Sequence, residues 1–228
     1  MNHGRVRAEL IGRIWRGVDP FVSFPKDLFA IDMQGWNSVH PYLIQEIEAN
    51  RPSIIVEIGV WKGGSTITMA RKLKELQLDA VVIAVDTWLG SWEHWVQDNW
   101  FGWLCMDHGR PQLYSKFMAN VLAAGVQDYV VPLPIDSINA SIILRQLRFE
   151  ADMLHIDGGH DYHSVNSDLT HWWNILRAGG TFIGDDYYPD GVAWADVKRA
   201  VDDFLRTHPY ADFRQSDGKC RATKLSTP

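Results

Sequence analysis

Residues 53–65 read SIIVEIGVWKGGS. The first six residues are mostly apolar and β-branched, which predicts a short strand that is buried on both faces. A glycine-containing turn follows at 59–64, and apolar residues at helical spacing then continue from 65 to 76. A buried strand, a glycine turn and a helix in this order form the first unit of a parallel α/β sheet.

The same alternation of strand and helix continues toward the C-terminus. Asp217-Gly218 separates two extended segments near the end of the chain, which predicts an antiparallel hairpin. The predicted fold class is α/β: a doubly wound, mostly parallel, seven-stranded sheet with helices on both faces and a C-terminal antiparallel hairpin. Strands are expected at 53–58, 80–85, 129–133, 151–156, 181–184, 211–216 and 219–225, and helices at 65–76, 111–124, 138–148, 161–177 (closed by Gly179-Gly180) and 192–206.

The segment upstream of this alternation has a different pattern. Residues 39–50 carry apolar side chains at helical spacing, and Arg51-Pro52 ends that helix. We therefore divide the chain into an N-terminal helical appendage or lid, residues 1–50, and a main domain, residues 51–228. The main domain contains a tryptophan-rich insert at 88–110.

The composition restricts the classes of function. Of the 228 residues, 46% are hydrophobic and 22% are charged, with a formal net charge of -6, which favours a packed domain over a disordered chain. The acidic balance argues against binding to nucleic acid or to an anionic membrane surface. Cys105 and Cys220 are too few for a disulfide framework or a zinc site. The sequence also lacks an apolar stretch suited to a signal peptide or a membrane span, so we expect a cytoplasmic protein.

The glycine turn carries a ligand-binding pattern. Its spacing is G-x-x-x-G-G, which departs from the G-x-G-x-x-G of dinucleotide sites. Gly63 lets a ligand approach the backbone, and the free amides of the following helix favour an anionic group. Glu57 precedes the first glycine and would repel a pyrophosphate, but it suits the cationic methionyl end of S-adenosylmethionine (SAM). The alternative is a plain turn between strand and helix.

Asp86 ends the second predicted strand. In doubly wound sheets an acidic side chain at this place holds the ribose hydroxyls of a bound nucleoside. The alternative is that Asp86 caps the turn that follows it. With the glycine turn beside it, we prefer the ribose role.

Three further carboxylates follow the later strands. Asp157 ends the fourth strand, and Asp185 and Asp186 end the fifth. Adjacent parallel strands lie about 5 Å apart, so these side chains should converge at one edge of the sheet and repel one another. A hard divalent cation such as Mg²⁺ would remove that repulsion. The alternatives are a solvated turn at Asp185-Asp186 and a helix cap at Asp157.

His160 lies three residues after Asp157. An imidazole at this place is suited to accept a proton near neutral pH, so we predict that His160 is the general base of the site. Two alternatives stay open: His160 caps the helix that begins near residue 161, or it is a fourth metal ligand.

These motifs resemble those of the class I SAM-dependent methyltransferases, which have a Rossmann-like fold. Within that class the chain is similar to the small metal-dependent O-methyltransferases, including catechol and macrolide-sugar O-methyltransferases, from about Val39 to the C-terminal hairpin. In this family an Asp after the fourth strand and an acidic pair after the fifth hold the metal. The catechol enzymes have a lysine base where this chain has His160, and the sugar-methylating relatives have a histidine.

The resemblance implies specific roles for the remaining residues. Asp136 and Ser137 would lie beside the adenine, although Asp136 could equally cap the next helix. Trp88 would cover the adenine face, next to Thr87. Residue pattern and resemblance together give the predicted sets. The predicted SAM-binding residues are Glu57, Gly59, Trp61, Gly63, Ser65, Asp86, Thr87, Trp88, Asp136 and Ser137; the predicted metal ligands are Asp157, Asp185 and Asp186; and the predicted catalytic residues are His160 and Asp157.

The insert at 88–110 follows the second strand and therefore lies on the ligand side of the sheet. Its tryptophan rings could stack on a sugar or aromatic acceptor, or pack a lid or an interface between copies of the chain. The oligomeric state therefore stays open. The rings are those of Trp88, Trp92, Trp95, Trp100 and Trp103.

The sequence thus predicts a SAM-dependent and Mg²⁺-dependent (or other divalent cation-dependent) O-methyltransferase. Its partner would be a hydroxylated small molecule, a sugar or a glycosylated natural product, with a catechol-type aromatic acceptor as the close variant. Two other functions compete with it: a nucleotide-dependent oxidoreductase and a non-catalytic SAM-binding protein. The missing G-x-G-x-x-G counts against the first, and the complete set of acids with His160 counts against the second.

Overall fold

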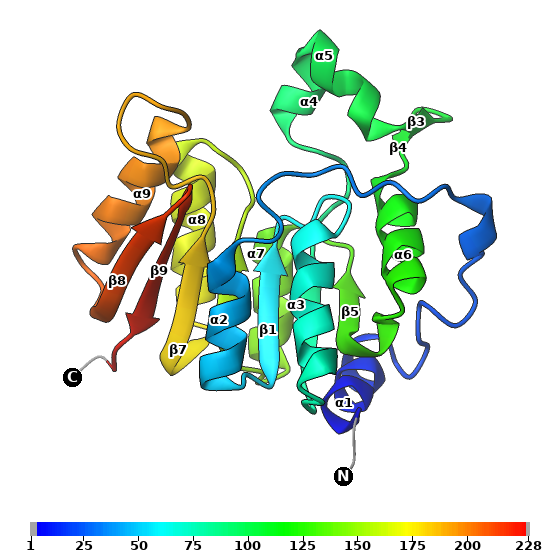
Figure 1. The fold of residues 1–228 in the computed structure, drawn as a ribbon, viewed down its shortest axis with the longest axis horizontal. Helices are drawn as coiled ribbons and strands as arrows, with labels where there is room; N and C mark the ends of the chain where they lie inside the picture. The colour runs from blue at the N-terminus through cyan, green and yellow to red at the C-terminus, as the bar shows by residue number, and fades with distance from the viewer. Residues whose placement is uncertain (1–3, 227–228) are drawn as a thin grey trace.

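A computed structural model of the protein describes residues 4–226, so the outermost residues of both predicted domains, 1–3 and 227–228, lie outside the described part. Its centre is a seven-stranded sheet with the strand order β5-β2-β1-β6-β7-β9-β8 (Figure 1). The first five strands of this order pair in parallel, and β9 and β8 add an antiparallel hairpin. The predicted fold class is confirmed. The strands are β1 (Ile54–Ile58), β2 (Val81–Val85), β5 (Val130–Leu133), β6 (Ala151–Ile156), β7 (Leu176–Gly184), β8 (Tyr210–Ser216) and β9 (Lys219–Lys224).

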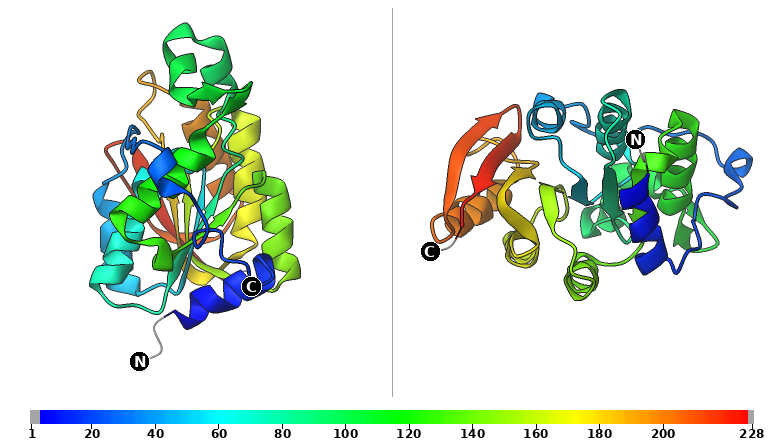
Figure 2. Two further views of the ribbon diagram at one scale, coloured as in Figure 1. Left: turned by 90° about the vertical axis from the view of Figure 1, so that its right-hand side faces the viewer. Right: turned by 90° about the horizontal axis from the view of Figure 1, so that it is seen from below.

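Helices cover both faces of the sheet, as the right-hand view of Figure 2 shows from below. Successive residues of a strand point to opposite faces, so Val56 and Ile58 pack into one apolar cluster while Ile55 packs into the other. Helices α2, α3 and α6 cover the Ile55 face, and α1, α7, α8 and α9 cover the opposite face. Their bounds are α1 (Arg5–Ile14), α2 (Pro41–Asn50), α3 (Gly64–Glu75), α6 (Leu113–Ala124), α7 (Ser137–Gln146), α8 (Tyr162–Trp173) and α9 (Ala195–Leu205).

The N-terminal segment contributes to both ends of the sheet. Helix α1 lies at the lower end in Figure 1, where Leu10 and Ile11 enter the core and Trp15 Nε1 donates a hydrogen bond of 2.9 Å to the Pro132 carbonyl. A 3-10 turn, η1 (Lys26–Leu28), follows, and the chain then crosses the top of the sheet before α2. The upper part of this segment, and not α1, reaches the ligand side of the sheet.

One predicted boundary is wrong. The helix expected at 161–177 ends at Trp173, and β7 begins at Leu176. Leu176 pairs with Ala151 of β6 and is buried, so its place in the sheet outweighs the local helical pattern. Gly179 and Gly180 therefore lie inside β7. Opposite them on β6, the pairing register shifts between Ala151 and Met153.

The tryptophan-rich insert rises above the carboxyl ends of the strands in Figure 1. It comprises α4 (Trp92–Val96), α5 (Asp98–Phe101), a 3-10 turn η2 (Gly102–Leu104) and the small antiparallel pair β3 (Met106–Asp107) and β4 (Arg110–Pro111); a third 3-10 turn, η3 (Gln127–Tyr129), precedes β5. Both cysteines, Cys105 and Cys220, are free thiols. Within residues 4–226, none of the helices combines the length and apolar character needed to cross a membrane.

Candidate active site

A cavity of about 740 Å³ lies above the carboxyl ends of the strands, between the sheet, the insert and the segment before α2. This is the edge at which doubly wound sheets bind their ligands. The cavity wall includes the turn after β1, the residues after β2, β6 and β7, and aromatic rings of the insert. Seven of the ten predicted SAM-binding residues line it: Gly59, Trp61, Ser65, Asp86, Thr87, Asp136 and Ser137.

The turn after β1 packs closely against the end of β6. Gly59 has φ +80°, and a Cβ atom there would lie 1.8 Å from the Asp157 carbonyl oxygen. The residue must be glycine because the two strand ends touch at this point. Asp86 stabilises the same turn: one of its oxygens accepts hydrogen bonds from Val60 N (2.8 Å) and Trp61 N (2.9 Å), and the other from Trp88 N (2.7 Å).

Three predicted SAM-binding residues do not line the cavity. The Trp88 ring is 2% exposed and packs against Tyr114 and Phe117 in the core, so we leave it out of the adenine-contacting set. Gly63 begins α3 with φ +90° and faces the ring of Phe117. Glu57 is fully buried beneath α3.

Glu57 is held by a dense set of donors. Its carboxylate accepts hydrogen bonds from Ser65 Oγ and Thr66 Oγ1 in the first turn of α3. Its Oε1 also lies 3.0 Å from Nδ1 of His155, its register partner across the β1–β6 pair. His155 is fully buried, and both of its ring nitrogens have hydrogen-bond partners.

Asp136 and Ser137 lie at the start of α7. Asp136 caps the helix by accepting a hydrogen bond of 3.0 Å from Asn139 N, while both residues also line the cavity. The Ser137 hydroxyl donates to Asp168, a buried carboxyl of α8. Burial raises the pKa of Asp168 to about 6. A buried carboxyl with a raised pKa therefore lies next to the predicted adenine region.

The acidic cluster is assembled as the strand register predicts. Asp157 and Asp185 follow the register partners Ile156 and Gly184, and both lie at the cavity wall with Asp186. Burial and the neighbouring carboxylate of Asp185 raise the pKa of Asp157 well above its usual range. For Asp185, burial acts in the same direction, but the ammonium of Lys219 holds the pKa of Asp185 below its ordinary value.

His160 lies between two carboxylates. Its Nδ1 is 3.2 Å from Glu93 Oε1, and its Nε2 is 3.1 Å from Asp186 Oδ2. Burial alone would lower the pKa of His160, but these two carboxylates raise it above its ordinary value. The imidazole is thus oriented by one carboxylate from the insert and one from the predicted metal ligands.

The resemblance to the metal-dependent O-methyltransferases implies a divalent cation at this cluster, and the carboxylate oxygens of Asp157 and Asp185 fit one. Ligand atoms of His155, Asp157 and Asp185 lie within 4.8 Å of one another, and carboxylate oxygens are the ligands that Mg²⁺ prefers. His155 is not available as a ligand, because both of its ring nitrogens already have partners. Among the described residues, the oxygen Oε2 of Glu93 is buried and has no hydrogen-bond partner. It belongs to the same carboxylate whose Oε1 contacts His160.

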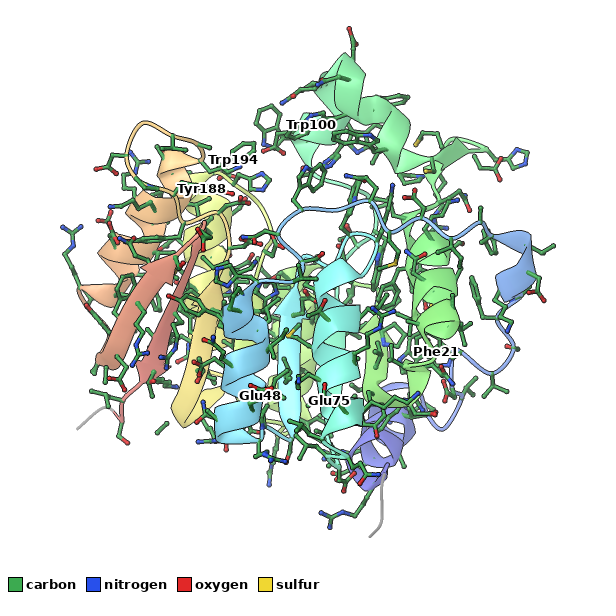
Figure 3. The ribbon with its side chains drawn as sticks, viewed as in Figure 1. Phe21, Glu48, Glu75, Trp100, Tyr188 and Trp194 are labelled. Atoms are coloured by element: carbon green, nitrogen blue, oxygen red, sulfur yellow. The ribbon has the colours of Figure 1, made fainter. Side chains whose placement is uncertain are left out.

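Several residues at this site had no signal in the sequence. Lys219 and Asn37 both contact Asp185, and Glu93 contacts His160. Trp194 stacks on His160, and Trp100 of the insert lies 6.3 Å from Trp194 between ring centroids. Figure 3 shows Trp194 and Tyr188 near the top of the sheet, with Trp100 opposite them in the insert. They come from loops, from the short helices of the insert or from the hairpin, whose positions depend on tertiary structure.

Comparisons with known proteins identify the family and the fold. A family model described as a methyltransferase domain matches residues 56–187. The uncharacterized protein y4gI of Sinorhizobium fredii (strain NBRC 101917 / NGR234) is 30% identical over 146 residues, which cover 60% of this chain and 13% of that protein. The chain therefore spans a small part of this relative's length.

Solved structures show the same fold. Cofactor-bound Rv0187 from MTB has a TM-score of 0.61 at 18% identity, over 100% of this chain and 99% of that one. The O-methyltransferase from Bacillus cereus in complex with SAH has a TM-score of 0.58 at 16% identity, over 96% of this chain and 97% of that one.

Proposed function

The chain belongs to the methyltransferase-domain family and has the fold of the class I SAM-dependent methyltransferases, and on this premise we propose that it methylates a hydroxyl oxygen of a small molecule. A divalent cation such as Mg²⁺ would assist the reaction at the acidic cluster. One observation carries the proposal: the glycine turn, Asp86, the acidic cluster and His160 all line a single cavity of about 740 Å³.

The two halves of this cavity suit the two substrates. The side formed by Gly59, Ser65 and Asp86 offers the start of α3 and a carboxylate for the methionyl and ribose parts of SAM. The side formed by Asp157, Asp186 and His160 offers oxygen ligands and a base to a hydroxyl group. A methyl donor and an acceptor bound in this way would meet at the end of β6.

Proton transfer would use His160. In the neutral imidazole, Nδ1–H would donate to Glu93 and Nε2 would be the accepting nitrogen; with Asp186 engaged by the cation instead of the ring, the acceptor O–H would give its proton to Nε2. The acceptor oxygen forms a bond to the SAM methyl carbon, and the bond between that carbon and sulfur breaks. The sulfonium becomes the neutral thioether of S-adenosylhomocysteine. The protein contributes mainly alignment of the two reactants.

Asp157, Asp185 and Asp186 would hold the cation. When bound, a divalent cation lowers the pKa of a coordinated hydroxyl and so makes its deprotonation easier near neutral pH. Without it, Asp157 and Asp185 lie close together at the ends of β6 and β7, with the buried ammonium of Lys219 bound to Asp185 and Asp186 paired with His160.

The acceptor side is lined by aromatic rings. Trp36, Trp100 and Trp194 form part of the cavity wall, with Trp36 and Trp100 separated by 6.2 Å between centroids. Flat aromatic surfaces bind the apolar faces of sugar rings and also stack on aromatic acceptors. We propose a sugar or a glycosylated natural product as the acceptor, with a catechol as the close variant, because adjacent hydroxyls can chelate one cation.

Methyl transfer from labelled SAM to sugars, glycosides and catechols, with Mg²⁺ and with EDTA, tests this function. We expect transfer that EDTA abolishes and Mg²⁺ restores. Asp157→Asn should reduce turnover at least about 100-fold while SAM affinity, measured by calorimetry, changes little. Asp27→Asn, an exposed carboxylate in η1, is the matched control.

The competing functions give different results in the same assay. SAM binding without transfer to any acceptor would indicate a non-catalytic SAM-binding protein. Binding of a nicotinamide dinucleotide in place of SAM would indicate an oxidoreductase. Transfer that is unaffected by EDTA and by Asp157→Asn would disprove the role of the cation.

A further inference from the structure

Lys219 is a fully buried lysine at the edge of the proposed active site. Its side chain is 0% exposed. Strand β9 lies between β7 and β8. The antiparallel pairing of Gly184 with Cys220 brings Lys219, the residue before Cys220, level with Asp185, the residue after Gly184. Buried lysines are rare and require partners, so this ammonium needs an explanation.

The hydrogen bonds of Lys219 show which ring nitrogen of the neighbouring His155 carries the proton. Its Nζ donates to Asp185 Oδ2 and lies 3.1 Å from His155 Nε2. An ammonium has only donors, so Nε2 of His155 must accept. The proton of the neutral imidazole is then on Nδ1, where it donates to Glu57 Oε1 at 3.0 Å. A continuous buried chain thus joins Glu57, below the SAM region, to Asp185 in the acidic cluster.

The other oxygen of Asp185 also has protein donors. Asp185 Oδ1 accepts hydrogen bonds from Asp186 N at 2.9 Å and from Asn37 Nδ2 at 3.3 Å. Asp185 therefore has a cationic partner and two further donors within the chain. Asp157 and Asp186 lie at the same cavity wall, and Asp186 is paired with His160.

We propose that Lys219 is a fixed internal cation of the acidic cluster, which neutralises Asp185, holds it in place and weakens the binding of a divalent metal ion there. The proposal rests on the cation site of the proposed function and identifies what regulates its affinity. Two positive groups at one carboxylate repel each other, and this repulsion is strong in a buried setting. The ammonium belongs to a buried residue of β9, so its charge repels a metal ion that binds to Asp185.

The test measures Mn²⁺ binding to the full-length protein by electron paramagnetic resonance, without SAM or acceptor. Lys219→Met removes the charge but keeps an unbranched side chain, and we expect it to bind Mn²⁺ about tenfold more tightly or better. Lys219→Arg keeps the charge and should retain an affinity close to that of the wild type. Lys219→Gln, which retains a donor for His155 without the charge, provides the same comparison if Lys219→Met does not fold.

Lys224→Met is the matched control. Lys224 lies on the same strand, and its ammonium donates to the carbonyls of Trp173 (2.7 Å) and Leu176 (2.6 Å), at the opposite end of β9 from the cluster. This variant loses the same charge and should leave Mn²⁺ affinity unchanged.

The outcomes separate this proposal from the proposed function. Equal or weaker Mn²⁺ affinity in the neutral Lys219 variants would overturn the role of Lys219 and leave methyl transfer untouched. Mn²⁺ binding by the neutral Lys219 variants, with no binding by the wild type, would support the role of Lys219, because it is the strongest form of the expected difference in affinity. Binding by none of the proteins would overturn both the role of Lys219 and the cation site. Absence of methyl transfer with the expected affinity differences would overturn only the proposed reaction.

Discussion

The indole of Trp194 stacks on the imidazole of His160, with ring centroids 4.1 Å apart and an angle of 20° between the ring planes. Carboxylates occupy both nitrogen edges of the same imidazole, and the indole covers one face. Trp194 itself has φ +48° and directly precedes α9. The proposed base is therefore held by residues from the insert, from the end of β7 and from the start of α9.

Replacing Trp194 tests whether this stacking orients the base. Trp194→Ala should lower kcat by about 10- to 100-fold, because a base displaced by an ångström or less loses its alignment with the acceptor. SAM affinity by calorimetry should be unchanged. Trp194→Phe keeps an aromatic face and should recover most of the rate. A kcat equal to that of the wild type in Trp194→Ala would show that the carboxylates alone position His160.

Glu93 provides a second test of the same base. Glu93→Gln keeps the shape of the side chain but removes its charge, and we expect a loss of about 10- to 100-fold in kcat, typical of groups that orient a catalytic residue. The KM for SAM should stay constant. Glu75→Gln, an exposed glutamate at the end of α3, controls for the general effect of the substitution. Loss of SAM binding in Glu93→Gln would point instead to collapse of the insert.

Gly59 is predicted to be the least tolerant glycine of the turn. A Cβ at this position would lie 1.8 Å from the Asp157 carbonyl, and φ is +80°. Gly59→Ala should therefore destabilise the protein by about 3 kcal/mol or more and abolish SAM binding, because strain and steric overlap act together. Gly102→Ala places a methyl group where no atom lies within 4 Å and should leave the unfolding midpoint nearly unchanged. Urea denaturation monitored by tryptophan fluorescence measures both.

Asp168 should make folding stability depend on pH. Burial raises its pKa from 3.8 to about 6 in the folded protein, so the folded state binds this proton more tightly than the unfolded state does. Its contribution favours folding at low pH and is lost as the pH rises through about 6. Asp168→Asn cannot ionise, so relative to the wild type it should gain about 2 kcal/mol in unfolding free energy between about pH 4.5 and 7.5.

Asp136 is the control of opposite sign. Hydrogen bonds from Asn139 lower the pKa of Asp136, so its contribution to stability is present above the unfolded pKa and is lost as the pH falls. Asp136→Asn should therefore cost nearly the same stability at about pH 4.5 and 7.5, which both lie above the unfolded pKa, and less stability at a pH below that pKa. Parallel pH trends for the two variants would contradict the assignment for Asp168.

The sequence predicted those parts of the fold and site that depend on local pattern and on sheet topology. The run at 53–65 is buried and β-branched and then rich in glycine, so β1 and its turn could be recognised directly. Asp157 and Asp185 were expected together because parallel strands bring their carboxyl ends to one edge, and the register confirms it. Membership of the methyltransferase family is confirmed by the match over 56–187.

Other parts were out of reach because their position depends on distant partners. Lys219 and Asp185 are 34 residues apart, and Glu93 and His160 are 67 residues apart. The insert was expected on the ligand side of the sheet, but nothing in the local sequence indicates that Glu93 would contact His160 or that the hairpin would bring Lys219 to Asp185. The start of β7 was predicted wrongly for a related reason. Leu176 lies in an amphipathic stretch that would suit a helix, and only its pairing with Ala151 makes it part of a strand.

The C-terminal hairpin has a consequence for how such enzymes diverge. The part of the chain that matches the family model ends at residue 187, yet Lys219 lies beyond it and Asn37 lies before it. The strand ends that bear the acids and His160 thus lie within the matched region, while Lys219 and Asn37, which contact Asp185, lie outside it. On the proposed function, substitutions in these flanking segments would change the affinity for the cation without changing a residue of the matched domain.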